Sequence, residues 1–203
     1  MTKHSYHKYV FNKSKRKFVG NFEGMYQNED VDPWYSSDLS NTEKKIHATM
    51  LSNYNFNTVL DYGCGKGAFT HILKKNNNEV SGVDISSNAI NKAKLMYGHL
   101  VDFSTLEEKK WQNKKYDLIV CLEVISYIKQ YKQLLKTFSI IGRHLYLSLY
   151  IPKNPIGFVK NFEELIKRVN LFYTINSKII YNDEKIFLFA KSNQYKKSNK
   201  GVL

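Results

Sequence analysis

The sequence predicts an α/β fold with a doubly wound, mostly parallel sheet of seven strands, closed by a C-terminal antiparallel β-hairpin and contained in a single domain. Apolar runs of strand length alternate with helical patterns between residues 41 and 150. A glycine-rich turn follows the first apolar run, and two further apolar runs without a helix between them come last. A chain of 203 residues has the length of one domain with a substantial core.

The first predicted helix spans about residues 41–53, where Ser40 or Asn41 can cap the first turn. It leads into an apolar strand at residues 58–62 and then into the glycine-rich turn. Because strand and helix patterns alternate from here on, we expect a parallel sheet with helices on both faces. The next predicted elements are a helix over 68–76, a strand over 79–84, a helix over 87–97 and a short strand within 98–103.

The alternation continues and then breaks in the last third of the chain. Two apolar runs there are joined by the turn-forming residues Asn182, Asp183 and Glu184, which predicts a terminal β-hairpin. The elements predicted after residue 103 are a strand over 116–122, a helix over 128–141, a strand over 144–150, a helix over 158–169, and the hairpin strands 171–181 and 185–191.

The formal net charge of +13 is concentrated at the two ends of the chain. Residues 1–18 carry six basic side chains and no acid, and residues 191–203 carry four lysines and no acid. We interpret residues 1–40 as a basic tail followed by a segment that caps the site, 41–192 as the main domain, and 193–203 as a basic disordered tail. Solvated ends are favoured over a polyanion-binding surface, so a nucleic-acid partner stays open but is not favoured.

Several classes of protein do not fit the sequence. No apolar run approaches the roughly 18 residues of a membrane span, and the first residues lack the apolar stretch of a secretory signal. The two cysteines, Cys64 and Cys121, follow core-like strands without metal-ligand spacing, which favours buried free thiols. We therefore expect a cytoplasmic protein without a metal site. No feature of the sequence indicates an oligomeric state.

The glycine-rich turn and the acidic residues around it indicate a ligand-binding site. Asp61 ends the first strand, Gly63, Gly65 and Gly67 follow at alternate positions, and the next strand ends in Asp84. Glycines allow a tight turn and let a ligand approach the backbone, and a helix that follows would offer free N–H groups to an anionic group. This arrangement is typical of a Rossmann-like site for an adenosine-containing cofactor.

On these residues the chain resembles the class I S-adenosylmethionine-dependent methyltransferases, over roughly residues 43–192. The motif Asp61-x-Gly63-x-Gly65-x-Gly67 is similar to the glycine-rich signature of that family. Within the family, the strings at residues 121–128 and 32–35 are similar to the NodS-like N-methyltransferases that modify sugars. The resemblance implies S-adenosylmethionine as the cofactor and S-adenosylhomocysteine as its product.

The resemblance also implies roles for individual residues in cofactor binding. Asp61 would hold the methionyl ammonium, directly or through water, and Asp84 would accept hydrogen bonds from the ribose hydroxyls. Ile85 would lie against the adenine ring. Asp102 would accept a hydrogen bond from the adenine amino group, and the Phe103 amide would donate to a ring nitrogen.

Other residues are candidates for the acceptor side of the site. Tyr26 and Trp34 could close over the sulfonium, because aromatic faces favour positive charge, or could simply pack the N-terminal segment onto the core. Glu123 and Tyr127 follow the fourth strand of the alternating pattern, at the edge of a doubly wound sheet where ligands bind. Glu123 is expected to contact the acceptor as a general base or as a hydrogen-bond partner.

The expected function is methyl transfer to a nitrogen or oxygen of a small molecule, such as a sugar or a phosphorylated or nucleotide-linked metabolite of surface-polysaccharide biosynthesis. An NAD-binding oxidoreductase is a rival interpretation, since Gly63-x-Gly65-x-x-Ala68 also satisfies a dinucleotide fingerprint, but Asp61 would repel a pyrophosphate. The sequence also leaves open an RNA or DNA methyltransferase that uses the basic ends, and a cofactor-binding module without turnover.

Overall fold

The computed structural model describes residues 7–28, 34, 38 and 40–196. The described chain forms two compact units, the first ending at Lys109 and the second beginning at Lys110. No helix in these residues is long and apolar enough to cross a membrane. Part of the string at residues 32–35 and the end of the basic tail at residues 197–203 lie outside the described residues.

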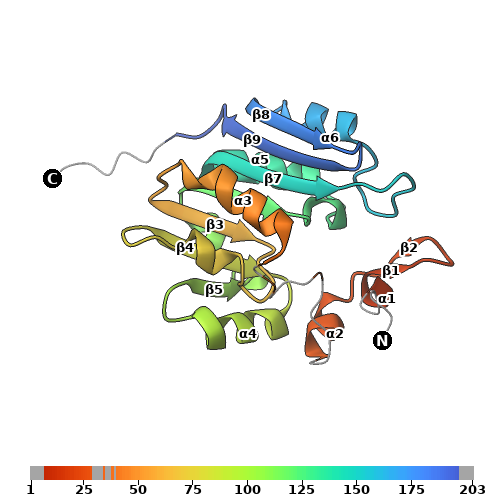
Figure 1. The fold of residues 1–203 in the computed structure, drawn as a ribbon, viewed down its shortest axis with the longest axis horizontal. Helices are drawn as coiled ribbons and strands as arrows, with labels where there is room; N and C mark the ends of the chain where they lie inside the picture. The colour runs from red at the N-terminus through yellow and green to blue at the C-terminus, as the bar shows by residue number, and fades with distance from the viewer. Residues whose placement is uncertain (1–6, 29–33, 35–37, 39, 197–203) are drawn as a thin grey trace. The chain divides into compact units, whose positions relative to one another are not determined.

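The first unit is built on three parallel strands in the order β5-β4-β3 (Figure 1). Most positions of the strands β3 and β4 are buried, on alternating sides of the sheet, as expected for parallel strands covered on both faces. Their register pairs Asp61 with Gly82, and it pairs Asp84 at the end of β4 with Thr105 at the end of β5. The bounds of these strands are β3 Thr58–Tyr62, β4 Glu79–Asp84 and β5 Asp102–Thr105.

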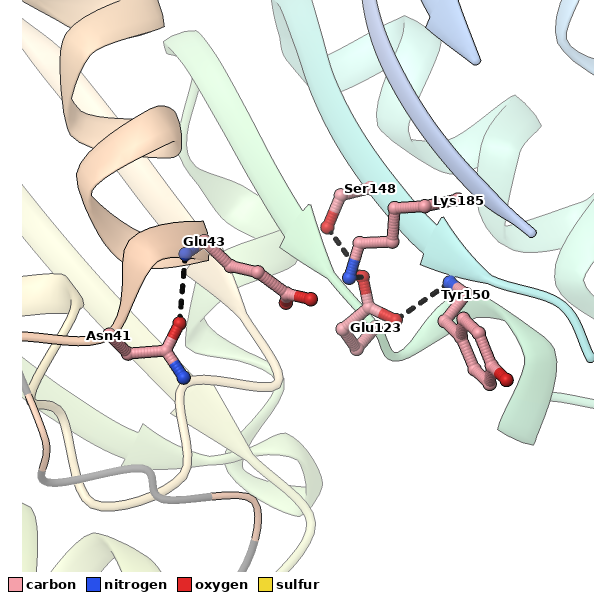
Figure 2. A network of polar contacts seen from close by, with 6 residues as sticks. All are labelled: Asn41, Glu43, Glu123, Ser148, Tyr150 and Lys185. Carbon is pink, nitrogen blue, oxygen red and sulfur yellow. Dashed lines mark hydrogen bonds and ion pairs between the residues drawn. The ribbon is translucent and has the colours of Figure 1, made fainter. Parts of the chain in front are cut away.

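Two α-helices of the first unit agree with the sequence prediction. Helix α3, Thr42–Ser52, begins where the Asn41 side chain accepts a hydrogen bond from the Glu43 amide at 2.8 Å (Figure 2). Helix α4, Ser87–Tyr97, begins where the Ser86 hydroxyl accepts from the Ala89 amide at 3.1 Å. Both N-caps use the side-chain oxygens that helix starts favour.

The helix predicted over 68–76 is wrong. A single 3-10 turn, Thr70–Leu73, follows the glycine loop instead. The Asn78 side chain closes this segment, because it accepts from the Lys75 amide and donates to the Leu73 carbonyl, both at 2.8 Å. Asparagine competes in this way with helical hydrogen bonds, and the neighbouring lysines repel one another. No α-helix N-terminus therefore comes directly after the described glycine loop.

The N-terminal segment is folded from residue 7, where the sequence favoured a solvated end. Val10 and Met25 are fully buried. A row of aromatic contacts joins the hairpin to the next helix, with ring centroids 6.0 Å apart for Phe11 and Phe18 and 6.3 Å apart for Phe18 and Phe22. Contacts between these half-buried rings hold the basic segment in place. Its elements are α1 His7–Val10, β1 Phe11–Asn12, β2 Lys17–Phe18 and α2 Phe22–Gln27.

The second unit holds four strands of the large sheet. Strand β7 pairs in parallel with β6 on one side and antiparallel with β9 on the other, and β8 pairs antiparallel with β9 at the edge. The bounds are β6 Tyr116–Leu122, β7 Gly142–Tyr150, β8 Tyr173–Tyr181 and β9 Lys185–Ser192. The predicted terminal hairpin is thus confirmed, and Asn182 and Asp183 at its turn have φ of 49° and 53°, as primed hairpin turns require.

The helices of the second unit start later than predicted. Helix α5, Tyr131–Ile141, is preceded by a 3-10 turn at Ile125–Tyr127. Helix α6, Phe162–Val169, starts where the Asn161 side chain accepts from an amide of the first turn. The strand order is β5-β4-β3 in the first unit and β6-β7-β9-β8 in the second, and the predicted fold class is confirmed.

Candidate functional site

The glycine loop between β3 and the 3-10 turn has a backbone that other residues rarely adopt. Gly63, Gly65 and Gly67 have φ of 80°, 55° and 77°. Left-handed conformations of this kind cost a side-chain-bearing residue about 1–2 kcal/mol. The amides of Gly63 and Cys64 both donate to the Val83 carbonyl, at 2.7 and 3.0 Å, which fixes the loop to the end of β4.

Asp84 connects the loop to the start of α4. Its Oδ2 accepts from the Gly65 amide and its Oδ1 from the Ser86 amide, both at 2.9 Å. Burial raises the pKa of this carboxyl above its ordinary value. A carboxylate has about four lone-pair positions, so the two amide contacts leave Asp84 able to accept further hydrogen bonds.

Asp61 is a second buried carboxyl, 4% exposed, at the end of β3. Its Oδ2 accepts from the Thr70 hydroxyl at 2.7 Å. Burial, with a smaller contribution from the charge of Asp84, raises the pKa of Asp61 to about 7. Two buried carboxyls that disfavour each other's ionisation are suited to a cationic ligand, because a cation would relieve both the desolvation and the repulsion.

Space around the loop is taken up by two aromatic side chains. A Cβ built on Gly65 would lie 2.7 Å from the hydroxyl oxygen of Tyr26, and one built on Gly67 would lie 2.6 Å from the Phe103 ring. Both aromatic residues are buried. The structure thus brings Tyr26 from α2 against the loop, and only glycine fits at these two positions.

The predictions for Asp102 and Phe103 need correction. Asp102 begins β5 and pairs with Ser81, three residues before the pair that Asp84 makes with Thr105. At about 3.3 Å per residue this is roughly 10 Å from the carboxyl ends of the strands, where the adenine would lie. The strand starts late because the Val101 amide still donates to the Tyr97 carbonyl in the turn after α4. Phe103 packs its ring under Gly67 and Gly82 as a core residue.

The remaining predicted residues of the first unit lie at two different places. Ile85 directly follows Asp84 and is 61% exposed, so its side chain is available at the end of β4. Trp34 packs on Phe22 of α2, with ring centroids 6.4 Å apart. Tyr26 and Trp34 are therefore both attached to α2, Tyr26 on the side of the glycine loop.

Glu123 of the second unit lies in a polar network of its own (Figure 2). Its Oε1 accepts from the Ser148 hydroxyl at 2.8 Å and lies 2.6 Å from the Lys185 ammonium, and its Oε2 accepts from the Tyr150 amide at 2.7 Å. Glu123 has a φ of 62°, unusual for a residue with a side chain. The surrounding contacts hold this backbone conformation, as is common at functional sites.

Tyr127 lies four residues after Glu123, in the 3-10 turn that precedes α5, and is half-buried. Tyr150, which donates its amide to Glu123, is exposed, and its hydroxyl donates to Glu184 at 3.2 Å. Glu123 and Tyr127, the two residues predicted to contact the methyl acceptor, therefore both lie in the short segment between β6 and α5.

The sequence analysis missed three residues that contact predicted carboxylates. Thr70 contacts Asp61, and Ser148 and Lys185 contact Glu123. Thr70 follows the last glycine of the loop by three residues, and this spacing could have suggested it. Lys185 gave no signal, because a lysine at the start of a strand is ordinarily exposed, whereas this side chain is 8% exposed. Within the described residues no cluster of histidine, cysteine and acidic side chains could hold a metal ion.

Comparison with known proteins identifies the family of this chain. A family model described as a methyltransferase domain matches residues 35–147. Nodulation protein S from Azorhizobium caulinodans is 33% identical over 109 residues, which are 51% of this chain and 52% of that protein. A ubiquinone biosynthesis O-methyltransferase from Nitrosomonas europaea is 29% identical over 77 residues, which are 35% of this chain and 33% of that protein. The chain spans about half or less of the length of these relatives.

Solved structures match over most of the chain. The magnesium protoporphyrin IX methyltransferase from Synechocystis PCC 6803, solved with S-adenosylhomocysteine, has a TM-score of 0.63 at 18% identity and covers 92% of this chain and 97% of its own. The N-methyltransferase NodS from Bradyrhizobium japonicum WM9, also solved with S-adenosylhomocysteine, has a TM-score of 0.65 at 19% identity. The match covers 83% of this chain and 94% of that protein's chain. At such identities the likeness establishes the fold.

Proposed function

The chain belongs to the methyltransferase domain family, and from that premise we propose that it transfers a methyl group from S-adenosylmethionine to a nitrogen or oxygen of a small molecule. One observation carries the proposal. Two buried carboxyls, Asp61 and Asp84, lie at the ends of adjacent strands beneath a loop whose glycines have positive φ. This pair of hydrogen-bond acceptors fits a ligand that is both cationic and rich in hydroxyl groups.

The proposed cofactor contacts follow from these two acceptors. Asp61 binds the ammonium of the methionyl part, which neutralises a carboxyl that burial otherwise disfavours as an anion. Asp84, held by the Gly65 and Ser86 amides, accepts from the ribose hydroxyls. Ile85 supplies an exposed apolar surface for the adenine ring. When bound, the cofactor supplies a methyl group activated by its sulfonium, so the protein mainly orients the reactants and excludes water.

Tyr26 and Trp34 are proposed to form the aromatic cover of the cofactor. Tyr26 is the stronger candidate, because its hydroxyl already lies next to Gly65. An aromatic ring near a sulfonium stabilises the positive charge and keeps water away. Trp34 contributes through its packing on Phe22 of the same helix.

For the acceptor we propose that Glu123 is an orienting hydrogen-bond acceptor and that Tyr127 contacts the same substrate. Both oxygens of Glu123 already receive hydrogen bonds, and Lys185 stabilises its negative charge. Because both oxygens are already engaged by protein groups, an orienting role suits Glu123 better than proton abstraction. A neutral amine would need no base at all.

We further propose that the acceptor is phosphorylated or nucleotide-linked, for example an activated sugar. Support comes from the β1–β2 hairpin, where Lys13, Lys15, Arg16 and Lys17 are all exposed. This hairpin leads within a few residues into α2, which carries Tyr26 (Figure 1). A cluster of cations near a site raises the local concentration of anionic substrates.

The acceptor proposal is tested by screening paired sugars with and without phosphate groups. The double charge reversal Lys15→Glu with Lys17→Glu should raise KM for the phosphorylated acceptor several-fold at low salt, and added salt should reduce the difference. Lys178→Glu on β8 is the control, since Lys178 is also an exposed lysine but does not belong to the β1–β2 hairpin. Equal KM values in both variants would contradict an anionic acceptor.

The cofactor proposal is tested first, by calorimetry with S-adenosylmethionine, S-adenosylhomocysteine, NAD and NADH. Binding of the first two should be lost in Asp84→Ala. Asp102→Asn is a matched control, because Asp102 lies at the opposite end of the strands and should leave the affinity unchanged. A preference for the nicotinamide cofactors would instead support an oxidoreductase. Retained binding in Asp84→Ala would refute the assignment of this site.

A further inference from the structure

Glu23, in the first turn of α2, makes an unusual set of contacts with the first turn of α4. Its Oε2 accepts from the Ser86 hydroxyl at 2.5 Å and from the Asn88 amide at 3.3 Å. Its Oε1 accepts from the Ser87 hydroxyl at 2.6 Å and from the Asn88 side-chain nitrogen at 2.7 Å. One carboxylate thus takes donors from three consecutive residues that lie more than 60 positions away in the sequence.

These contacts favour the ionised carboxylate. The start of a helix carries free amides and a partial positive charge, which stabilise a nearby anion. Desolvation alone would raise the pKa of Glu23, but the hydrogen bonds from Ser86, Ser87 and Asn88 outweigh it and hold that pKa below its ordinary value. Glu23 is therefore charged at neutral pH, and its hydrogen bonds are of the stronger, charge-assisted kind.

A second contact fastens the other end of α2. The Lys92 ammonium, further along α4, donates to the Tyr26 carbonyl at 2.7 Å. Between the two attachments lies Met25, which is fully buried. The side chain of Tyr26 is fixed with its hydroxyl against Gly65. The position of Tyr26 over the glycine loop thus depends on how α2 is attached to α4.

Ser86 contacts both Asp84 and Glu23. Its amide donates to Asp84 Oδ1, the proposed ribose-binding carboxylate, and its hydroxyl donates to Glu23. We propose that Glu23 is a positioning residue that couples cofactor binding at Asp84 to the docking of α2, and so to the placement of Tyr26. The inference rests on the proposed function but adds a residue that does not itself touch the cofactor.

The test compares Glu23→Gln with Glu163→Gln by calorimetry with S-adenosylhomocysteine. Glu163 is the matched control because it also lies in the first turn of a helix, α6, and is exposed. Glu23→Gln should bind about tenfold more weakly, the effect of losing one charge-assisted interaction, while Glu163→Gln should bind as the wild type does. Ser87→Ala, which removes one donor and leaves Glu23 in place, should give a smaller loss in the same direction.

A second measurement separates this positioning role from general destabilisation. Hydrogen exchange in α2, residues 22–27, should be slowed by S-adenosylhomocysteine in the wild type, and should be faster and insensitive to the ligand in Glu23→Gln. If Glu23→Gln matches Glu163→Gln in affinity, the coupling is refuted. If the wild type binds no S-adenosylhomocysteine, the proposed function fails, whereas exchange of α2 in the unliganded variants still tests the attachment. Unchanged exchange there would refute the attachment too.

Discussion

Among single residues, Asp61 is the one whose chemistry is most sensitive to its surroundings. Burial raises its pKa to about 7, so near neutral pH the free protein holds this carboxyl in both protonation states. A ligand ammonium selects the ionised form. Binding must therefore displace a proton from the fraction of molecules that carry one, and the affinity becomes linked to pH.

We predict that the affinity for S-adenosylmethionine rises between pH 6 and pH 8. Well below the pKa of Asp61 each pH unit should change the affinity up to about tenfold, and above it the change should level off. Calorimetry in buffers of different ionisation enthalpy would measure the released proton directly. Asp61→Asn should bind weakly with little pH dependence. An affinity of the wild type that is flat over this range would contradict the assignment of Asp61 to the ammonium.

The same raised pKa affects the stability of the free protein with the opposite sign. The folded state holds the proton up to about pH 7, while the unfolded chain releases it near 3.8. The stabilising contribution is complete below the unfolded pKa and is lost as pH rises through the folded one. At pH 8 Asp61→Asn should therefore be more stable than the wild type, on the order of 4 kcal/mol, and near pH 4 the difference should nearly vanish. Urea unfolding at both pH values would measure it.

At Gly65, the cost of backbone strain and the cost of a steric clash can be measured separately. A methyl group there meets both a φ of 55° and the Tyr26 hydroxyl at 2.7 Å, while the next atom of that ring is 3.5 Å away. Gly65→Ala should destabilise the protein by about 2–3 kcal/mol. Adding Tyr26→Phe removes the close contact, so the double variant should recover about 1 kcal/mol in a urea-unfolding double-mutant cycle. Strict additivity would show that the hydroxyl is not the obstacle.

At the scale of elements, the end of β6 is held by the start of β9. Lys185 opens β9 and its ammonium pairs with Glu123, which follows β6. Their side chains are unequally exposed, at 8% for Lys185 and 34% for Glu123. A charge left without its partner is costly in proportion to its burial.

This inequality gives a prediction about stability. Glu123→Gln removes the negative charge that lies 2.6 Å from the buried Lys185 ammonium and should cost about 2–4 kcal/mol. Lys185→Met leaves a partly solvated carboxylate and should cost less, and the double variant should be more stable than Glu123→Gln alone. Chemical denaturation of the three variants provides the comparison. The reverse order of the single variants would mean that the carboxylate is the more deeply buried partner.

Elements with long apolar runs could be predicted from the sequence, while those decided by a few polar side chains could not. Strands β3, β4 and β6 were predicted with their observed bounds. Strand β6 is a long apolar run, and β3 and β4 are short runs bounded by polar or glycine-rich segments. The helix after the glycine loop failed because the Asn78 side chain ends it, a contact that no periodicity encodes.

In the candidate site, too, some residues could be predicted from the sequence and others could not. Asp61, Asp84 and the glycines stand in a local motif, so their neighbourhood could be predicted. Asp102 was misplaced because the turn after α4 delays β5, and register is set by pairing and not by the order of residues. Glu23 was missed because its partners begin at Ser86, and contacts across such sequence distances leave no local pattern.

For the whole molecule, the formal net charge of +13 is the dominant electrostatic property. Like charges repel across the folded surface and favour expansion, and salt screens this repulsion within about 10 Å at 0.1 M. We predict that the melting temperature rises by about 2–5 °C between 20 and 300 mM sodium chloride. Scanning calorimetry with potassium chloride as the control would separate screening from specific ion binding. A melting temperature that falls with salt would show that attractive pairs outweigh the repulsion.

The position of β9 has a consequence for how the protein is made. Strand β9 lies between β7 and β8, yet it is synthesised after both of them. A ribosome delivers residues in order, so one edge of β7 stays bare until residues 185–192 have emerged. During that interval the nascent chain exposes an unpaired, apolar strand edge of the kind that recruits chaperones or associates with other chains. A stop codon placed within β9 should therefore lower the yield of native protein far more than the number of residues removed would suggest.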